Sequence, residues 1–196
     1  MDRRSAWQGL AAGIFLVGKL VGKPAWAATP HAPDFDEQGY RSARYRAPVD
    51  RLPSPARRIA LEDALKLAPG RDALFVDVLP VESGYRDPVS GRWHLSQPHE
   101  TVPGAVWHPE TGRSPVDPVL WRGLVAAVAA TRADRPRLPV VLFCRVDCWM
   151  GWDAARRLAK GGTGRVLWLA EGIEGWSGAG RTLIAALPEV IAPTMG

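Results

Sequence analysis

Cysteine is scarce in this sequence, with only Cys144 and Cys148 among 196 residues. A disulfide between them would close a very short loop, and chain-entropy stabilisation grows with the length of the loop that a disulfide closes. A purely structural staple is therefore a poor explanation for this spacing. The sequence also lacks Cys-x-x-Cys-His, so the two cysteines do not form a c-type haem attachment site.

Long apolar runs are scarce as well. The N-terminal run at residues 9–18 is interrupted by Lys19, and it is shorter than the roughly 20 apolar residues that a membrane span needs. It follows two arginines and precedes Ala25-Trp26-Ala27, the small-x-small pattern of a signal cleavage site. We therefore expect residues 1–27 to be a cleaved signal peptide. The mature protein would be periplasmic, with no membrane span.

A concentrated basic patch is also missing. The formal net charge is +5, from 25 Lys and Arg against 20 Asp and Glu. Residues 1–27 hold four basic residues and one acidic residue, so 21 basic and 19 acidic residues remain, a net charge of +2. Proteins that bind nucleic acid gather Lys and Arg on one face or along one helix, so we expect no nucleic-acid partner.

Residues 28–56 are rich in proline, which interrupts regular secondary structure. The prolines are Pro30, Pro33, Pro48, Pro53 and Pro55. Two interpretations fit this composition: an extended N-terminal arm that packs on the domain through Tyr40, Tyr45 and the segment at residues 45–48, or a disordered linker. We assign residues 28–56 as the arm and residues 57–196 as a single domain.

Two kinds of apolar segment alternate from residue 57 onward. Short continuous runs are typical of strands that are buried on both faces; they lie at 73–78, 105–107, 140–143 and 165–169. Segments with helical spacing lie between them, at 61–68, 118–132, 151–160 and 172–176. This alternation predicts an α/β fold with a mainly parallel sheet flanked by helices.

Local signals predict where several elements begin and end. Asp117-Pro118 is a typical helix start, and Gly161-Gly162 a typical helix stop. The turn-forming segment at residues 87–91 predicts a hairpin tip. Residues 183–187 are expected to add a final helical turn.

Residues 144–150, Cys-Arg-Val-Asp-Cys-Trp-Met, join the predicted strand at 140–143 to the following helix. Ligands of open α/β sheets bind at the carboxyl ends of the strands. Amide groups at the start of the helix, together with the helix dipole, would stabilise a thiolate on Cys144 and lower its pKa. Cys144 is therefore the predicted reactive thiol.

Several motifs in this order resemble the rhodanese-like domain, over about residues 57–182. They are the Val102-Pro103-Gly104-Ala105 segment, a cysteine directly after a buried strand, and Gly172-Ile173-Glu174-Gly175-Trp176. The resemblance implies that Cys144 carries a persulfide within a cradle of backbone amides. The loop departs from the family at Cys148, and Trp149 and Met150 replace polar or basic residues, which leaves Arg145 as the only cation of the loop.

The departure has a resemblance of its own. Cys-x-x-x-Cys-Trp-Met, followed by Trp152 and Ala154-Ala155, is similar to an exported rhodanese-like subgroup named for a CXXCW motif and associated with PQQ-dependent alcohol catabolism. The resemblance implies a small sulfur donor or acceptor as partner, or a periplasmic redox protein such as a PQQ-dependent dehydrogenase system. Gly151 and Asp153 stand where this subgroup leads us to expect Ser and Asn.

Three interpretations of the site remain open. In the first, Cys144 attacks or carries sulfur and Cys148 resolves it by thiol–disulfide exchange. The expected substrate contacts are Arg145, Trp149, Met150 and Gly151. If the loop turns like a helix, the two Cβ atoms would lie about 5–6 Å apart. A disulfide, which needs about 3.8 Å, would then be strained or require loop movement.

The second interpretation is a module that binds copper or another redox cofactor. Two thiolates with Met150 or a histidine would suit Cu(I), and the available histidines are His94, His99 and His108. The third interpretation is a docking domain whose cysteines form an inert disulfide.

Charged residues near the predicted site also have assigned roles. Asp77 at a strand end is expected to be structural. Asp147 would raise the pKa of the thiols, whereas Arg145 would lower it. Three further arginines are either anion contacts or solvated surface residues: Arg86, Arg92 and Arg113.

Overall fold

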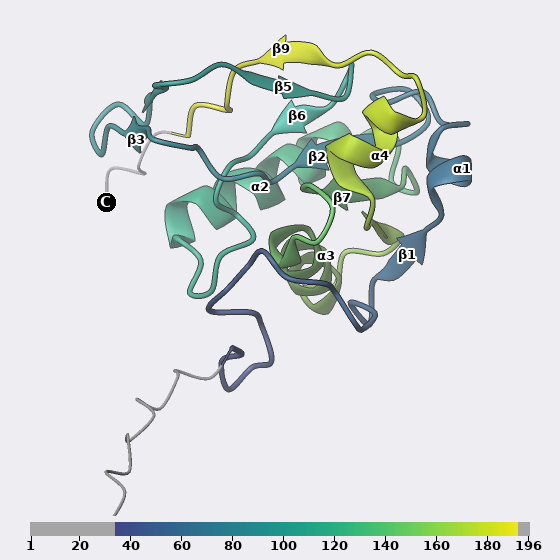
Figure 1. Cartoon of the computed structure of the whole chain (residues 1–196), viewed down its shortest axis with the longest axis horizontal. Helices are drawn as coiled ribbons and strands as arrows, with labels where there is room; N and C mark the ends of the chain where they lie inside the picture. The colour runs from purple at the N-terminus through teal and green to yellow at the C-terminus, as the bar shows by residue number, and fades with distance from the viewer. Residues whose placement is uncertain (1–33, 192–196) are drawn as a thin grey trace, which may run out of the picture. The chain divides into compact units, whose positions relative to one another are not determined.

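The computed structural model of the protein describes residues 34–191, so the expected signal peptide lies outside the described residues. A five-stranded sheet in the order β1-β8-β7-β2-β6 forms the centre of the fold (Figure 1). All four strand pairings are parallel. The strands are β1 (Arg57–Ile59), β8 (Val166–Leu169), β7 (Val140–Phe143), β2 (Leu74–Asp77) and β6 (Val106–Trp107).

Helices cover both faces of this sheet, because successive residues of its strands point to opposite sides. In β7, Val140 and Leu142 pack in one core cluster, with α2 (Pro118–Thr131) and α3 (Trp149–Lys160). The intervening Val141 and Phe143 pack in a second cluster. That cluster includes residues of α1 (Leu61–Ala64) and α4 (Gly172–Gly178). The prediction of an α/β fold with a parallel sheet flanked by helices is confirmed.

The predicted boundary signals act as expected at three places. The Asp117 side chain accepts hydrogen bonds from the amides of Val119 (2.7 Å) and Leu120 (3.3 Å) at the start of α2. Gly161 is the residue at which α3 ends. The segment at residues 87–91 joins two antiparallel strands, β3 (Tyr85–Arg86) and β4 (Trp93–His94).

Three local predictions need correction. Residues 183–187 form no helical turn, because β9 (Ile184–Ala186) pairs antiparallel with β5 (His99–Thr101), a partner distant in the sequence. The helix expected at 61–68 is only the short α1, and β1 precedes it because it pairs with β8. Helix α3 begins at Trp149, two residues earlier than expected.

The described part of the arm, residues 34–56, packs on the domain. The Arg41 amide donates to Asp153 Oδ1 on α3 (2.9 Å), and the Ser114 amide donates to the Tyr45 hydroxyl (2.8 Å). Tyr40 is buried as well. These contacts hold residues 34–56 against the domain.

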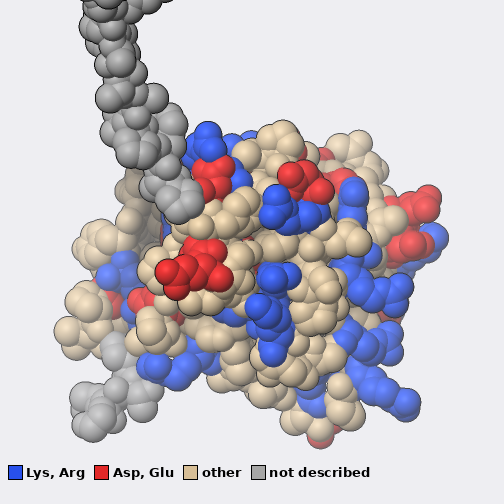
Figure 2. Space-filling view, turned by 90° about the horizontal axis from the view of Figure 1, so that it is seen from below, with Lys and Arg blue, Asp and Glu red and all other residues tan. Residues whose placement is uncertain are grey.

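The surface of the described residues carries mixed charge. On the face shown in Figure 2, basic side chains form several separate groups with acidic and uncharged side chains between them. Within residues 34–191, no helix has both the length and the apolar character needed to cross a bilayer.

Candidate functional site

The two cysteines form a disulfide at the carboxyl edge of the sheet. Cys144 directly follows the central strand β7, and Cys148 is the residue that precedes the first turn of α3. Their Cα atoms lie 6.1 Å apart, within the usual range for disulfides. The loop does not turn like a helix, because Cys148 is extended (φ −125°, ψ 116°) and Asp147 has φ +52°.

Helix α4 holds one side of the Cys loop, residues 144–148. The Ile173 amide donates to the Cys144 carbonyl (3.0 Å), and the Val146 amide donates to Glu174 Oε2 (3.0 Å). Gly172 has φ +57°, and a Cβ there would lie 2.4 Å from the Cys144 carbonyl oxygen. The first glycine of the Gly-x-x-x-Trp motif is therefore required for close approach of α4 to the loop.

The arm holds the other end of the Cys loop in the manner of a short added strand. The Ala47 amide donates to the Asp147 carbonyl (3.0 Å), and the Trp149 amide donates to the Tyr45 carbonyl (2.9 Å). Arg46 pairs with Cys148 in an antiparallel bridge. Because its amide bonds to Tyr45, Trp149 does not offer it to Cys144. The expected cradle of loop amides is therefore reduced at both Val146 and Trp149.

The predicted substrate contacts have different surroundings. Trp149 is 2% exposed and packs edge-on against Phe35 and Trp152, so it belongs to the contact between α3 and the arm. A Cβ on Gly151 would lie 3.2 Å from the Cys144 amide nitrogen, so this glycine lets the first turn of α3 approach the end of β7. Met150 is buried and lines the pocket described next.

A pocket of about 490 Å³ opens onto the disulfide, and we call it the thiol pocket. Four arginines and one carboxylate, Glu82, contribute to its walls. The arginines are Arg44 and Arg46 from the arm, Arg113, and Arg145 from the Cys loop. Arg145 was predicted as a contact and Arg113 as a candidate. Arg44 and Arg46 were missed, because only the folded position of the arm places them beside the cysteines.

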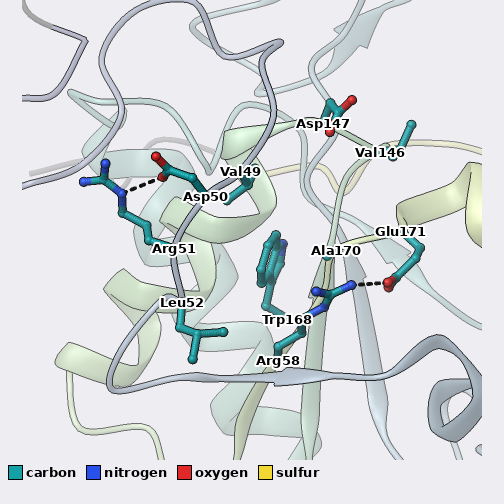
Figure 3. Close-up of a pocket in the computed structure, with 10 residues that line it drawn as sticks. All are labelled: Val49, Asp50, Arg51, Leu52, Arg58, Val146, Asp147, Trp168, Ala170 and Glu171. Atoms are coloured by element: carbon teal, nitrogen blue, oxygen red, sulfur yellow. Dashed lines mark hydrogen bonds and ion pairs between the residues drawn. The ribbon is translucent and has the colours of Figure 1, made fainter.

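A second pocket, of about 440 Å³, borders the same loop through Val146 and Asp147 (Figure 3). We call it the paired pocket, because ion pairs occupy its walls. Arg51 Nε lies 2.9 Å from Asp50 Oδ1, and Arg58 pairs with Glu171. Figure 3 shows these two pairs and the ring of Trp168 between them. Neither cysteine lines it.

The histidines considered as metal ligands lie apart from the thiol pocket. His94 stacks on Tyr85 in the hairpin (4.6 Å between ring centroids), and His99 Nε2 lies 2.8 Å from Asp77 Oδ2. His108 is buried, and burial lowers its pKa to about 4. Within residues 34–191, no three His, Cys, Asp or Glu side chains are grouped so that they could hold a metal ion.

The remaining charged candidates lie outside the thiol pocket. Asp77 is fully buried and accepts hydrogen bonds from the Leu79 amide (2.9 Å) and the Thr101 hydroxyl (2.6 Å). Arg86 donates to the Ile191 carbonyl, and Arg92 lies in the β3–β4 hairpin with its amide bonded to Ser90. None of these side chains lines the thiol pocket.

Asp153 is a buried carboxyl group that sequence reasoning noted only as a departure from a resemblance. Its side chain lies on α3 and is 0% exposed. Burial raises the pKa of Asp153 to about 8, although the hydrogen bond from the Arg41 amide and the charge of Arg157 act to lower it. The arm is therefore anchored on a carboxyl group that is mostly protonated at neutral pH.

Comparison with known proteins gives a likeness to a solved structure. No protein-family model matches the sequence, and no curated protein matches it. Among solved structures, the chain is similar to a thiosulfate sulfurtransferase from Pseudomonas aeruginosa, with 21% sequence identity and a TM-score of 0.46. The similarity covers 72% of this chain and 22% of that one. The chain therefore spans less than a quarter of the length of that sulfurtransferase.

Proposed function

We propose that this chain is a rhodanese-like thiol–disulfide redox protein in which Cys144 and Cys148 interconvert between disulfide and dithiol. The disulfide at the carboxyl end of β7, facing the thiol pocket, carries the proposal. A bridge across a sequence separation of four adds little as a staple. A disulfide that lines a pocket is instead placed for attack by an incoming thiolate.

The location and partner belong to the same proposal. Export to the periplasm suits a protein with a disulfide, because disulfides persist in oxidising compartments. The partner is a small sulfur compound or a periplasmic redox protein, such as a PQQ-dependent dehydrogenase system.

Sulfur transfer through a persulfide on Cys144 is the second candidate function. The arginines of the thiol pocket favour it, because they suit an anionic sulfur donor. The amides of Val146 and Trp149 count against it, because they already bond to Glu174 and Tyr45. The disulfide must also be reduced before Cys144 can accept sulfur. The same dithiol, with Met150, is what a Cu(I)-binding role would require.

Mass spectrometry of the natively purified protein, before and after thiol alkylation, tests these functions together. We expect one disulfide in the protein as purified, and a single two-electron transition when the folded protein is equilibrated in thiol–disulfide buffers of graded potential. A one-sulfur adduct on Cys144 after treatment with thiosulfate would favour sulfur transfer, and a copper adduct would favour metal binding. A disulfide that stays oxidised at every potential until the protein unfolds would overturn the redox proposal.

A further inference from the structure

Within residues 34–191, the thiol pocket is the cavity that both cysteines line. Cys144 is 1% exposed and Cys148 is 4% exposed. The arm is hydrogen-bonded to the loop at Asp147 and Trp149, and α4 is hydrogen-bonded to it at Cys144 and Val146. Exchange requires a thiolate to contact one of the two sulfur atoms. The low exposure of both cysteines favours a small thiol over a cysteine on the surface of another folded protein, and a volume of about 490 Å³ is in the range of small-molecule sites.

The charge of the thiol pocket selects among small thiols. Three of its four arginines have carboxylate partners: Arg44 pairs with Asp34, Arg113 with Glu110, and Arg145 with Glu82. Four cations against three carboxylates leave a net charge of +1. Arg46 is the unbalanced cation: it donates to the Val146 carbonyl (2.7 Å), and none of the ion pairs found in residues 34–191 includes it. A pocket with an unbalanced cation raises the local concentration of anions.

We propose that the thiol pocket admits a small thiol that carries an additional anionic group, such as a carboxylate or sulfonate, and that this thiol exchanges with the Cys144–Cys148 disulfide. The inference rests on the proposed redox function and names its substrate class. It also assigns Arg44 and Arg46 of the arm to the substrate site. The arm is therefore part of the site and not only a covering segment.

The small thiol is the only reductant that the proposed exchange with the Cys144–Cys148 disulfide requires. One thiolate attacks one sulfur of the disulfide, so that a mixed disulfide forms, the Cys144–Cys148 bond breaks, and the other cysteine leaves as a thiolate. A second thiolate of the same compound then attacks the mixed disulfide. Two small thiols are oxidised to one small disulfide, and their two electrons and two protons pass to the cysteines as two thiols.

Three thiols with the same two-carbon skeleton test the inference on the full-length protein: 2-mercaptoethanesulfonate, 2-mercaptoethanol and cysteamine. They carry a negative, a neutral and a positive group. The rate of loss of the protein disulfide, measured by quenched alkylation and mass spectrometry, is divided by the thiolate concentration of each reagent. We expect the sulfonate to react about tenfold faster than cysteamine at low salt, with the difference shrinking as salt is added.

Matched variants locate the effect. Arg46→Gln should lower the preference for the sulfonate about threefold, whereas Arg58→Gln in the paired pocket should leave it unchanged. Equal rates for the three reagents, or faster reduction by a dithiol protein of the thioredoxin type, would overturn the substrate assignment and leave the redox function standing. Failure of all four reductants to act on the folded protein would instead remove the redox function itself.

Discussion

The two pockets that border the Cys loop share a wall-forming arm but differ in charge. Arm residues 44–46 line the thiol pocket and residues 49–52 line the paired pocket. The thiol pocket keeps a net charge of +1 when the carboxylate partners are included. In the paired pocket, Arg51 and Arg58 face three carboxylates, Asp50, Asp147 and Glu171, which leaves −1. The fold thus directs the disulfide toward a basic cavity while an acidic cavity lies beside it.

The same comparison shows how one loop can serve both cavities. Cys144, Arg145 and Cys148 line the thiol pocket, whereas Val146 and Asp147 line the paired pocket. The extended conformation of Cys148 and the positive φ of Asp147 produce this alternation. A helical loop would have turned these side chains differently and would not have placed the sulfur atoms and Asp147 in separate cavities.

The largest expected effect comes from removing one sulfur from the thiol pocket. Cys148→Ser should abolish reversible two-electron oxidation, because Cys144 then has no partner in the chain. Alkylation and mass spectrometry of the variant after redox equilibration would check this. Val146→Ala changes a side chain of the same loop that lines the paired pocket, and it should retain the transition. A surviving intramolecular two-electron transition in Cys148→Ser would contradict the assignment of the chemistry to this pocket.

Displacing the loop that separates the pockets should have the next largest effect. Gly172→Ala should lower the free energy of unfolding by about 4 kcal/mol, because the new Cβ would lie 2.4 Å from the Cys144 carbonyl oxygen at a positive φ. Gly178→Ala is the matched control on α4, since a Cβ there would have nothing within 4 Å. It should be neutral or stabilising by about 0.5 kcal/mol. Equal urea midpoints for the two variants would show that α4 does not fix the loop.

The arm lines both pockets, and the stability of its contact with Asp153 should depend on pH. The folded protein keeps a proton on Asp153 up to about pH 8, whereas the unfolded chain releases it near pH 4. The contribution of Asp153 to stability therefore falls as pH rises from about 4 to 8 and is constant above that range. Asp153→Asn removes this dependence.

The difference in free energy of unfolding between Asp153→Asn and the unchanged protein should accordingly be near zero at pH 4. It should reach about 5 kcal/mol in favour of the variant at pH 8. Urea titrations at several pH values measure it. The groups around Asp153, which include Arg41, Arg157, Asp36 and Tyr40, are common to both proteins. A difference that does not change with pH would mean that Asp153 is ionised throughout this range.

Most of the central sheet could be predicted from the sequence because its strands are buried on both faces and appear as short apolar runs. Residues 140–143 are an example, and their burial is complete. β9 and β1 could not be predicted, because each is a strand only through pairing with a partner distant in the sequence. Exposed strands of three residues carry too few apolar side chains for a period to be recognised.

The residues of the candidate site likewise fall into those that the sequence reveals and those that it does not. The cysteines and Arg145 could be identified because they are contiguous with a buried strand, and Arg113 was at least a candidate. Arg44 and Arg46 could not be identified, because their role depends on the backbone hydrogen bonds that fix residues 45–47 against the Cys loop. Local sequence carries no signal for contacts of this kind. The expected cradle of backbone amides is reduced for the same reason, because the amides of Val146 and Trp149 bond to Glu174 and Tyr45.

The smallest expected effect comes from breaking an ion pair of the paired pocket. Arg58 and Glu171 are 50% and 28% exposed, so their attraction is screened by water. Arg58→Gln should lower the free energy of unfolding by at most about 0.5 kcal/mol and leave the rate of disulfide exchange unchanged.

Arg145→Gln breaks the comparably exposed pair with Glu82 and should also have little effect on stability. It should nevertheless slow the anionic thiol, because Arg145 lines the pocket that holds the sulfur atoms. Urea titration and the exchange assay on both variants give four values, and a slower exchange rate in Arg58→Gln would mean that the two pockets are not electrostatically distinct.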